Sequence, residues 1–382
     1  MVWLYSGFIV FILIMLALDL FVVNRKPHEI SIKAAVFWTG VCVVLALLFS
    51  FVVFQMYEHN SLNIANATRE RNALQITTRS GLPPLTLGQP IPELPAPAAD
   101  ATADDIADSK EAWTAAQNAL NASDRKVAWQ ATLEFLSGWL IEYSLSLDNI
   151  FVIAIIFAHF GIPKQYQHRV LFWGILGALI MRGIMIALGA VLIAQFQWIL
   201  YVFGAFLIFT AFKLLRNNDH EATPEEGFIY KLARRVFPFH PEIVGQKFFI
   251  RKDGRLWMTP LFLVLLIVEG TDVVFAVDSI PAIFAITQDP FLVFTSNVFA
   301  ILGLRSLYFA LAAMMDKFRF IKVSLAIVLA FIGVKMILLY WHIHLLTAVS
   351  LGVIVTVLGG GILASLLIPP PQSQDQHPTP VA

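Results

Sequence analysis

Long apolar stretches recur along this sequence and dominate its pattern. A helix needs about 20 mostly apolar residues to cross the hydrocarbon core of a bilayer. Nine stretches meet this length: residues 2–23, 34–57, 133–158, 170–193, 197–215, 259–286, 293–315, 323–341 and 345–368. The pattern predicts an all-α polytopic membrane protein with about nine transmembrane helices. The first stretch lacks a preceding basic region and a following small-residue cleavage site, so we expect a spanning helix and not a signal peptide.

The connections between these stretches differ in charge. Basic residues follow the first, third, fifth and seventh stretches: Arg25, Lys26, Lys33, Lys164, Arg169, Lys317, Arg319, Lys322 and the basic loop 217–258. The short connections near Gln195, Asp289 and His342 contain no Lys or Arg. Because basic loops stay in the cytoplasm, the pattern predicts an N-terminus outside and a cytoplasmic C-terminus.

One long polar segment interrupts the pattern. Residues 58–128 have a Pro/Ala-rich middle and scattered acids, which predict an extracytoplasmic tether with a short helix near 109–128. Residues 369–382 are expected to form a disordered cytoplasmic tail. The chain then divides into two N-terminal helices (1–57), the loop 58–128, a first three-helix unit (129–216), the basic loop 217–258, a second three-helix unit (259–341), a last helix (342–368) and the tail.

The two three-helix units resemble each other. Asp148, Arg182 and Lys213 are separated by 34 and 31 residues, and Asp272, Arg305 and Lys335 by 33 and 30. The local sequence agrees as well, since GILGALIMR ends at Arg182 and NVFAILGLR ends at Arg305. Three spans are an odd number, so the second unit would enter the membrane from the opposite side. This arrangement is an inverted repeat, which many transporters place around a site near the membrane midplane.

Composition narrows the classes of function. Hydrophobic residues make up 58% of the 382 residues and charged residues 14%, which is too apolar for a soluble domain of this size. The 26 basic and 26 acidic residues balance, so a nucleic-acid partner is not expected. The expected partner is the lipid bilayer. The single cysteine, Cys42, excludes an intramolecular disulfide and is best interpreted as a small apolar residue of a helix.

Acidic residues interrupt three of the apolar stretches. They are Asp19, Glu142, Asp148, Glu269, Asp272 and Asp278. Each ionised acid at the bilayer centre costs about 2.5–3.5 kcal/mol on insertion scales, unless it is paired, protonated or metal-bound. Arg182 and Arg305 can offset only part of this charge. Interhelical ion pairs that only fix packing are one interpretation, but ionisable residues inside membranes are more often functional.

The chemistry of these acids favours a hard cation. Carboxylates with neutral oxygens from Ser146, Asn149, Thr271 and Ser279 suit Mn²⁺, Mg²⁺ or Ca²⁺. Glu269 and Asp272 share one helical face, whereas residues six apart diverge by about 120°. We therefore expect helix 259–286 to bend or unwind near Gly270 or Pro281. His342 and His344 either contact the metal or serve as interfacial anchors.

Several segments resemble the TerC family of integral membrane proteins. They are SLSLDNIFV from Ser144, VEGTDVVFAVDSIPAIFAIT over 268–287, FAILGLRSLYF over 299–309 and the ALDL segment at Asp19. The resemblance covers nearly the whole chain except 58–128 and is greatest to Alx-type proteins of the bacterial inner membrane. It implies manganese export, an association with tellurium resistance, and Glu142, Asp148, Glu269, Asp272, Asp278 and Asp19 as metal ligands.

We therefore expect a secondary transporter that exports Mn²⁺ in exchange for protons, with Mn²⁺ as cargo and no tightly bound cofactor. No nucleotide-binding motif is present, which disfavours ATP-driven transport. An interaction protein that supports metalation or secretion of exported proteins, with the secretion machinery as partner, is the alternative. An enzyme is not expected, because no nucleophile–base set is evident.

Overall fold

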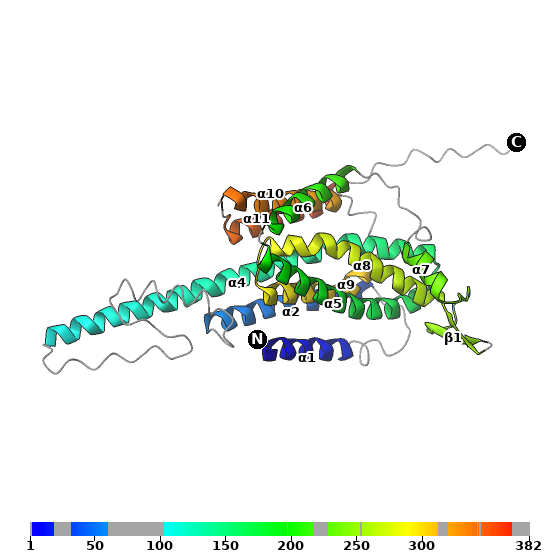
Figure 1. Cartoon of the computed structure of the whole chain (residues 1–382), viewed down its shortest axis with the longest axis horizontal. Helices are drawn as coiled ribbons and strands as arrows, with labels where there is room; N and C mark the ends of the chain where they lie inside the picture. Colours follow the sequence, from blue (N-terminus) through cyan, green and yellow to red (C-terminus); the bar gives the residue numbers. More distant parts are fainter. Residues whose placement is uncertain are drawn as a thin grey trace. The chain divides into compact units, whose positions relative to one another are not determined.

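A computed structural model describes residues 2–18, 32–59, 103–196, 198–216, 228–252, 254–311, 320–341, 343 and 345–368. The described elements are helical apart from one hairpin (Figure 1). In chain order they are α1 (Val2–Leu18), α2 (Ile32–Glu58), α4 (Ala103–His159), α5 (Lys164–Gln195), α6 (Ile199–Arg216), α7 (Phe228–Val236), β1 (Phe249–Lys252), β2 (Arg255–Met258), α8 (Pro260–Phe284), α9 (Pro290–Leu311), α10 (Ile321–Leu338), the 3₁₀ turn η5 (Leu339–Trp341) and α11 (Thr347–Leu367).

Eight of the described helices are long and apolar enough to cross a membrane, and α1 adds a shorter apolar helix. Their outer surfaces carry large apolar side chains. On α5, for example, Ile180, Ile184, Leu188 and Val191 are each at least half exposed and recur at helical spacing. Such a stripe is unstable in water but suits a lipid environment. The predicted all-α polytopic membrane fold is therefore confirmed.

The chain divides into two compact units, each described by itself. The first contains Met1–Val23 and Leu45–Leu136. Aromatic rings pack within it, with centroids 5.4 Å apart for Phe8 and Phe49 and 5.3 Å apart for Phe49 and Phe135. Glu58 also accepts a 3.1 Å hydrogen bond from Arg125.

The second compact unit contains Asn24–Val44 and Ser137–Ala382, and it holds the predicted repeat apart from residues 129–136. Helix α4 runs antiparallel to α8, because Gly138 lies against Ile283 while Asn149 lies against Asp272. Helix α5 runs parallel to α8, with Gly177 beside Glu269 and Gly189 beside Phe284.

Helices α6 and α10 lie side by side in the same unit (Figure 1). They are antiparallel, since Tyr201 meets Tyr340 at a centroid distance of 5.8 Å and Ile208 lies beside Gly333. These directions are the ones an inverted repeat requires, and the repeat itself stays a prediction.

Helix α8 does not break. It is continuous from Pro260 to Phe284, so the predicted unwinding at Gly270 or Pro281 is wrong, while a bend there stays a prediction. Pro281 lies in the last turn, where it removes the backbone hydrogen bond to the carbonyl of Val277 without ending the helix before Phe284. Gly270 instead provides room for a neighbour, because a Cβ there would overlap the side chain of Ile229 on α7. The glycine is used for close packing, not for flexibility.

The basic loop carries a hairpin that the hydrophobic pattern did not predict. Strands β1 and β2 pair antiparallel with Lys252 opposite Arg255. Gly254 has φ +74°, a conformation that glycine adopts without strain. The Asp-Gly dipeptide at 253–254 is the signal of a two-residue hairpin turn that would have revealed it.

Some predictions concern residues outside those that the structure describes. They include Asp19, His342, His344, the loop residues 60–102 and the tail 369–382. The helix predicted near 109–128 is real, and it is continuous with the following span as part of α4. Cys42 lies in α2, where its thiol donates to the carbonyl of Leu302 at 3.9 Å, in keeping with a structural role.

Candidate functional site

Arg182 is the centre of the buried polar cluster. It lies on α5 with a side chain only 3% exposed, and it donates to both carboxylate oxygens of Asp272 on α8 at 3.0 and 2.7 Å. It also forms an ion pair with Glu142 on α4 and contacts Asn297 on α9 at 3.5 Å. One guanidinium therefore joins four helices through ion pairs and charge-assisted hydrogen bonds.

The cluster lies near the middle of the apolar helix α8. Asp272 lies twelve residues into α8, about 18 Å along its axis, in a hydrocarbon core about 30 Å thick. The amide of Asn149 on α4 donates to Asp272 at 3.3 Å. Glu142 is 1% exposed, so its charge is compensated by Arg182 and not by water. The charges are thus arranged across helices, as expected for a functional intramembrane site.

A cavity of about 70 Å³ adjoins the cluster. Its polar lining comes from six side chains on four helices: Glu142, Asn149, Arg182, Thr210, Asp278 and Ser279. Asp278 accepts a hydrogen bond from Thr210 on α6 at 3.0 Å. The buried atoms Ser279 Oγ and Asn149 Oδ1 have no hydrogen-bond partner among the described residues. Because buried polar atoms are normally paired, these oxygens are available to a ligand or water.

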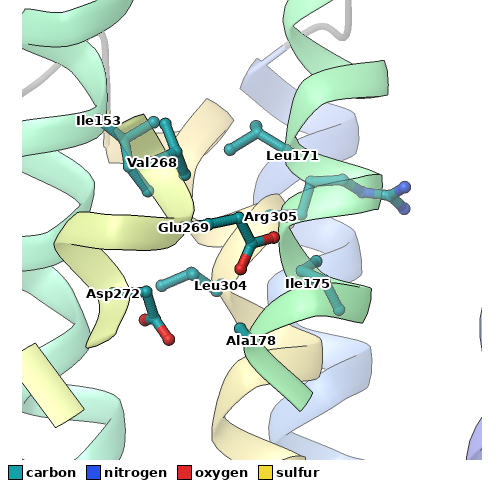
Figure 2. Close-up of a pocket in the computed structure, with 10 residues that line it drawn as sticks. Ile153, Leu171, Ile175, Ala178, Val268, Glu269, Asp272, Leu304 and Arg305 are labelled. Atoms are coloured by element: carbon teal, nitrogen blue, oxygen red, sulfur yellow. The ribbon is translucent and has the colours of Figure 1, made fainter. Parts of the chain in front are cut away.

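A second, smaller cavity of about 20 Å³ is lined by Glu269, Asp272 and Arg305 together with apolar residues. Figure 2 shows the carboxylate of Glu269 directed toward α5, while the guanidinium of Arg305 points away from both acids. A Cβ at Gly177 would overlap this carboxylate. The glycine therefore makes room for Glu269.

The two cavities meet at the Arg182–Asp272 pair. Asp272 lines the smaller cavity and Arg182 the larger one, so their hydrogen bonds lie between Glu269 on one side and Asp278 on the other. The arrangement places an ion pair between two cavities that are each lined by acids.

The structure brings some predicted acids together and separates others. Glu142 and Asp272 share Arg182, Asp278 lines a cavity with Glu142, and Glu269 lies in the other cavity. The side chain of Asp148 and all of Asp19 lie outside the described residues. Among the described side chains, no three His, Cys, Asp or Glu residues are grouped closely enough to hold a metal ion. Their role as metal ligands stays a prediction.

Sequence reasoning missed three contributors to the site: Asn297, Thr210 and Gly177. Asn297 is 1% exposed and begins the NVFAILGLR segment of the repeat. A buried amide in an apolar helix was the available signal for it. The sequence held no signal for Gly177, because its role is to leave room for the side chain of Glu269 on another helix.

Comparison with known proteins agrees with this architecture. The profile of the family described as integral membrane protein TerC matches residues 127–373. The chain belongs to the TerC family. No solved structure matches it.

Full-length relatives support the same assignment. A membrane protein of Myxococcus xanthus, STKORF319, is 42% identical over 95% of this chain and 92% of its own length. A membrane-bound redox modulator named Alx from Escherichia coli K12 is 39% identical over 93% of this chain and 91% of its own. A Rickettsia bellii membrane protein is 46% identical over 62% of this chain and 78% of its own length. This TerC family member is therefore similar to Alx along nearly its whole length.

Proposed function

We propose that this TerC family protein is a secondary transporter that exports divalent cations, above all Mn²⁺, from the cytoplasm in exchange for protons. The observation that carries the proposal is the Arg182–Asp272 pair between two acid-lined cavities. Carboxylate, amide and hydroxyl oxygens are the ligands that hard divalent cations prefer. The same carboxylates can carry protons when the metal has left.

The order of the acids along α8 supports a path for the cation. Glu269 lies nearer the start of this helix, which follows the basic loop, and Asp278 lies nearer its end. By the positive-inside rule the start of α8 faces the cytoplasm. A cation would pass from the Glu269 cavity to the Asp278 cavity when the ion pair between them rearranges. Rocking of the two three-helix units is the motion expected of an inverted repeat.

The protein is proposed to lie in the bacterial inner membrane with its N-terminus outside and its C-terminus in the cytoplasm. It carries no resident cofactor and catalyses no covalent reaction. The cation is its cargo.

Flux measurements on purified protein in liposomes test this function. We expect Mn²⁺ movement driven by an imposed pH gradient, with competition from Mg²⁺ and Ca²⁺ reporting selectivity. Asp272→Asn should abolish flux while the protein remains folded. Glu242→Gln is the matched control, because this acid is 83% exposed and lies outside the spans. Normal flux in Asp272→Asn would contradict the assignment. Metal binding without flux would favour the role in metalation or secretion.

A further inference from the structure

Arg182 occupies the carboxylates that a transported cation needs. Its guanidinium binds Asp272 at 2.7 and 3.0 Å and forms an ion pair with Glu142. With Arg182 in place these two acids keep one negative charge in excess. A divalent cation arriving at the same oxygens would meet a fixed positive charge within a few ångströms, at low dielectric, where like charges repel strongly.

The surroundings give the guanidinium somewhere to move. The cavity of about 70 Å³ is lined by Arg182 and Asp278 alike, so a second carboxylate faces the same space. Arginine has a long side chain with several rotatable bonds, and it keeps its charge in any environment of this kind. Moving from Asp272 toward Asp278 would leave Asp272 and Glu142 to the incoming ion.

Two neutral oxygens beside the acids could also bind the incoming cation. Asn149 is 4% exposed and Ser279 2% exposed, and each has a buried oxygen without a partner among the described residues. Both line the cavity and adjoin the acids. Arg182 could donate to such oxygens, but neither of them accepts a hydrogen bond from it in the structure. A hard cation would bind them directly. They are better suited to the metal-bound state than to the arginine-bound one.

We propose that Arg182 is a tethered counter-cation that competes with the cargo for Asp272 and Glu142. In the cargo-free protein it offsets one of their two negative charges and keeps the two cavities apart. Cargo binding displaces it into the larger cavity, and release of the cargo returns it. Because every cargo ion must displace Arg182, the residue lowers the affinity for the metal and prevents the protein from being trapped in its bound state. This inference rests on the proposed transport function.

Equilibrium binding of Mn²⁺ to the purified full-length protein tests the competition. The signal of free Mn²⁺ in electron paramagnetic resonance reports the bound fraction. Arg182→Gln removes the competitor, so we expect Mn²⁺ to bind about tenfold more tightly, while flux at saturating Mn²⁺ falls. A purely structural arginine would instead give weaker binding on removal. Arg234→Gln on α7, which changes an exposed arginine of the basic loop, is the control and should match the wild type.

Arg182→Lys keeps the inference testable if Arg182→Gln does not fold. The ammonium retains the buried charge but cannot bridge two carboxylates as a planar guanidinium does. It is thus a weaker competitor, and Mn²⁺ affinity should lie between those of the wild type and Arg182→Gln. Unchanged or weaker Mn²⁺ binding in a folded Arg182→Lys or Arg182→Gln protein would overturn the inference while leaving transport intact. Absence of Mn²⁺ binding and flux in the wild type would overturn both.

Discussion

Arg182 and Asp272 are 90 residues apart in the sequence, yet both oxygens of the carboxylate accept hydrogen bonds from the guanidinium. The pair joins the second helix of the first predicted repeat unit to the first helix of the second unit. Such a contact is sensitive to any relative motion of the units, because a bidentate pair tolerates little displacement. It therefore links the packing of the helices to the accessibility of the cavities on its two sides.

Loss of Arg182 alone should destabilise the protein more than loss of Arg182 together with Asp272. Arg182→Gln leaves two buried acids without compensation, and we expect it to cost about 3 kcal/mol. The double variant Arg182→Gln with Asp272→Asn removes one of those charges, so we expect it to regain about 1–2 kcal/mol. Thermal unfolding in detergent, followed by the fraction of monodisperse protein, ranks the stabilities of the wild type, the single variant and the double variant. Additive losses in the double variant would show that the two side chains are not coupled.

Gly177→Ala should impair transport without unfolding the protein. The added methyl group would overlap the carboxylate of Glu269 and push it out of its place against α5. We expect Mn²⁺ flux to fall at least about tenfold, since displacements of about 1 Å in a site have effects of this size.

The matched control for that change is Gly352→Ala, which makes the same substitution in α11, where nothing lies within 4 Å of the added atom. There we expect unchanged flux and a gain of about 0.5–1 kcal/mol in stability, because alanine is the better helix former. Equal flux for the two variants would mean that Glu269 does not need its present position.

The spans were predictable because each one satisfies its own backbone hydrogen bonds within a single apolar run. The stretch 170–193, for example, corresponds to α5 over Lys164–Gln195, and 259–286 to α8 over Pro260–Phe284. Local composition alone decides such segments. The acids within them were equally visible, because an ionisable residue in a long apolar run is conspicuous.

The grouping of the acids was less predictable, because it depends on how helices pack. The sequence indicated that Arg182 offsets part of the negative charge, but not that it bridges Glu142 and Asp272. Gly270 was interpreted as a hinge, whereas it accommodates Ile229 from α7. A glycine required for flexibility and one required for close approach are identical in a single sequence, and only the neighbouring helix distinguishes them.

A close crossing of α6 and α10 depends on two glycines. A Cβ at Gly333 would lie 2.6 Å from the carbonyl oxygen of Gly204, and a Cβ at Gly204 would lie 2.9 Å from that of Gly333. Backbone cannot move aside as a flexible side chain can, so Gly333→Ala should cost about 1–3 kcal/mol. Thermal unfolding in detergent measures the loss. Gly359→Ala, in open space on α11, should show none, and equal stability of the two variants would argue against a tight crossing.

The proposed orientation can be tested with single cysteines, because Cys42 is the only natural one. In a Cys42→Ala background, Gln288→Cys probes the exposed connection between α8 and α9, and Glu242→Cys probes the basic loop. If basic loops are cytoplasmic, a membrane-impermeant maleimide should label Gln288→Cys in intact spheroplasts and Glu242→Cys only after permeabilisation. The reverse labelling would place the Glu269 cavity on the outer side and reverse the proposed direction of export. Labelling of both positions in intact spheroplasts would mean that the two loops do not lie on opposite sides of the membrane, which the inverted repeat requires.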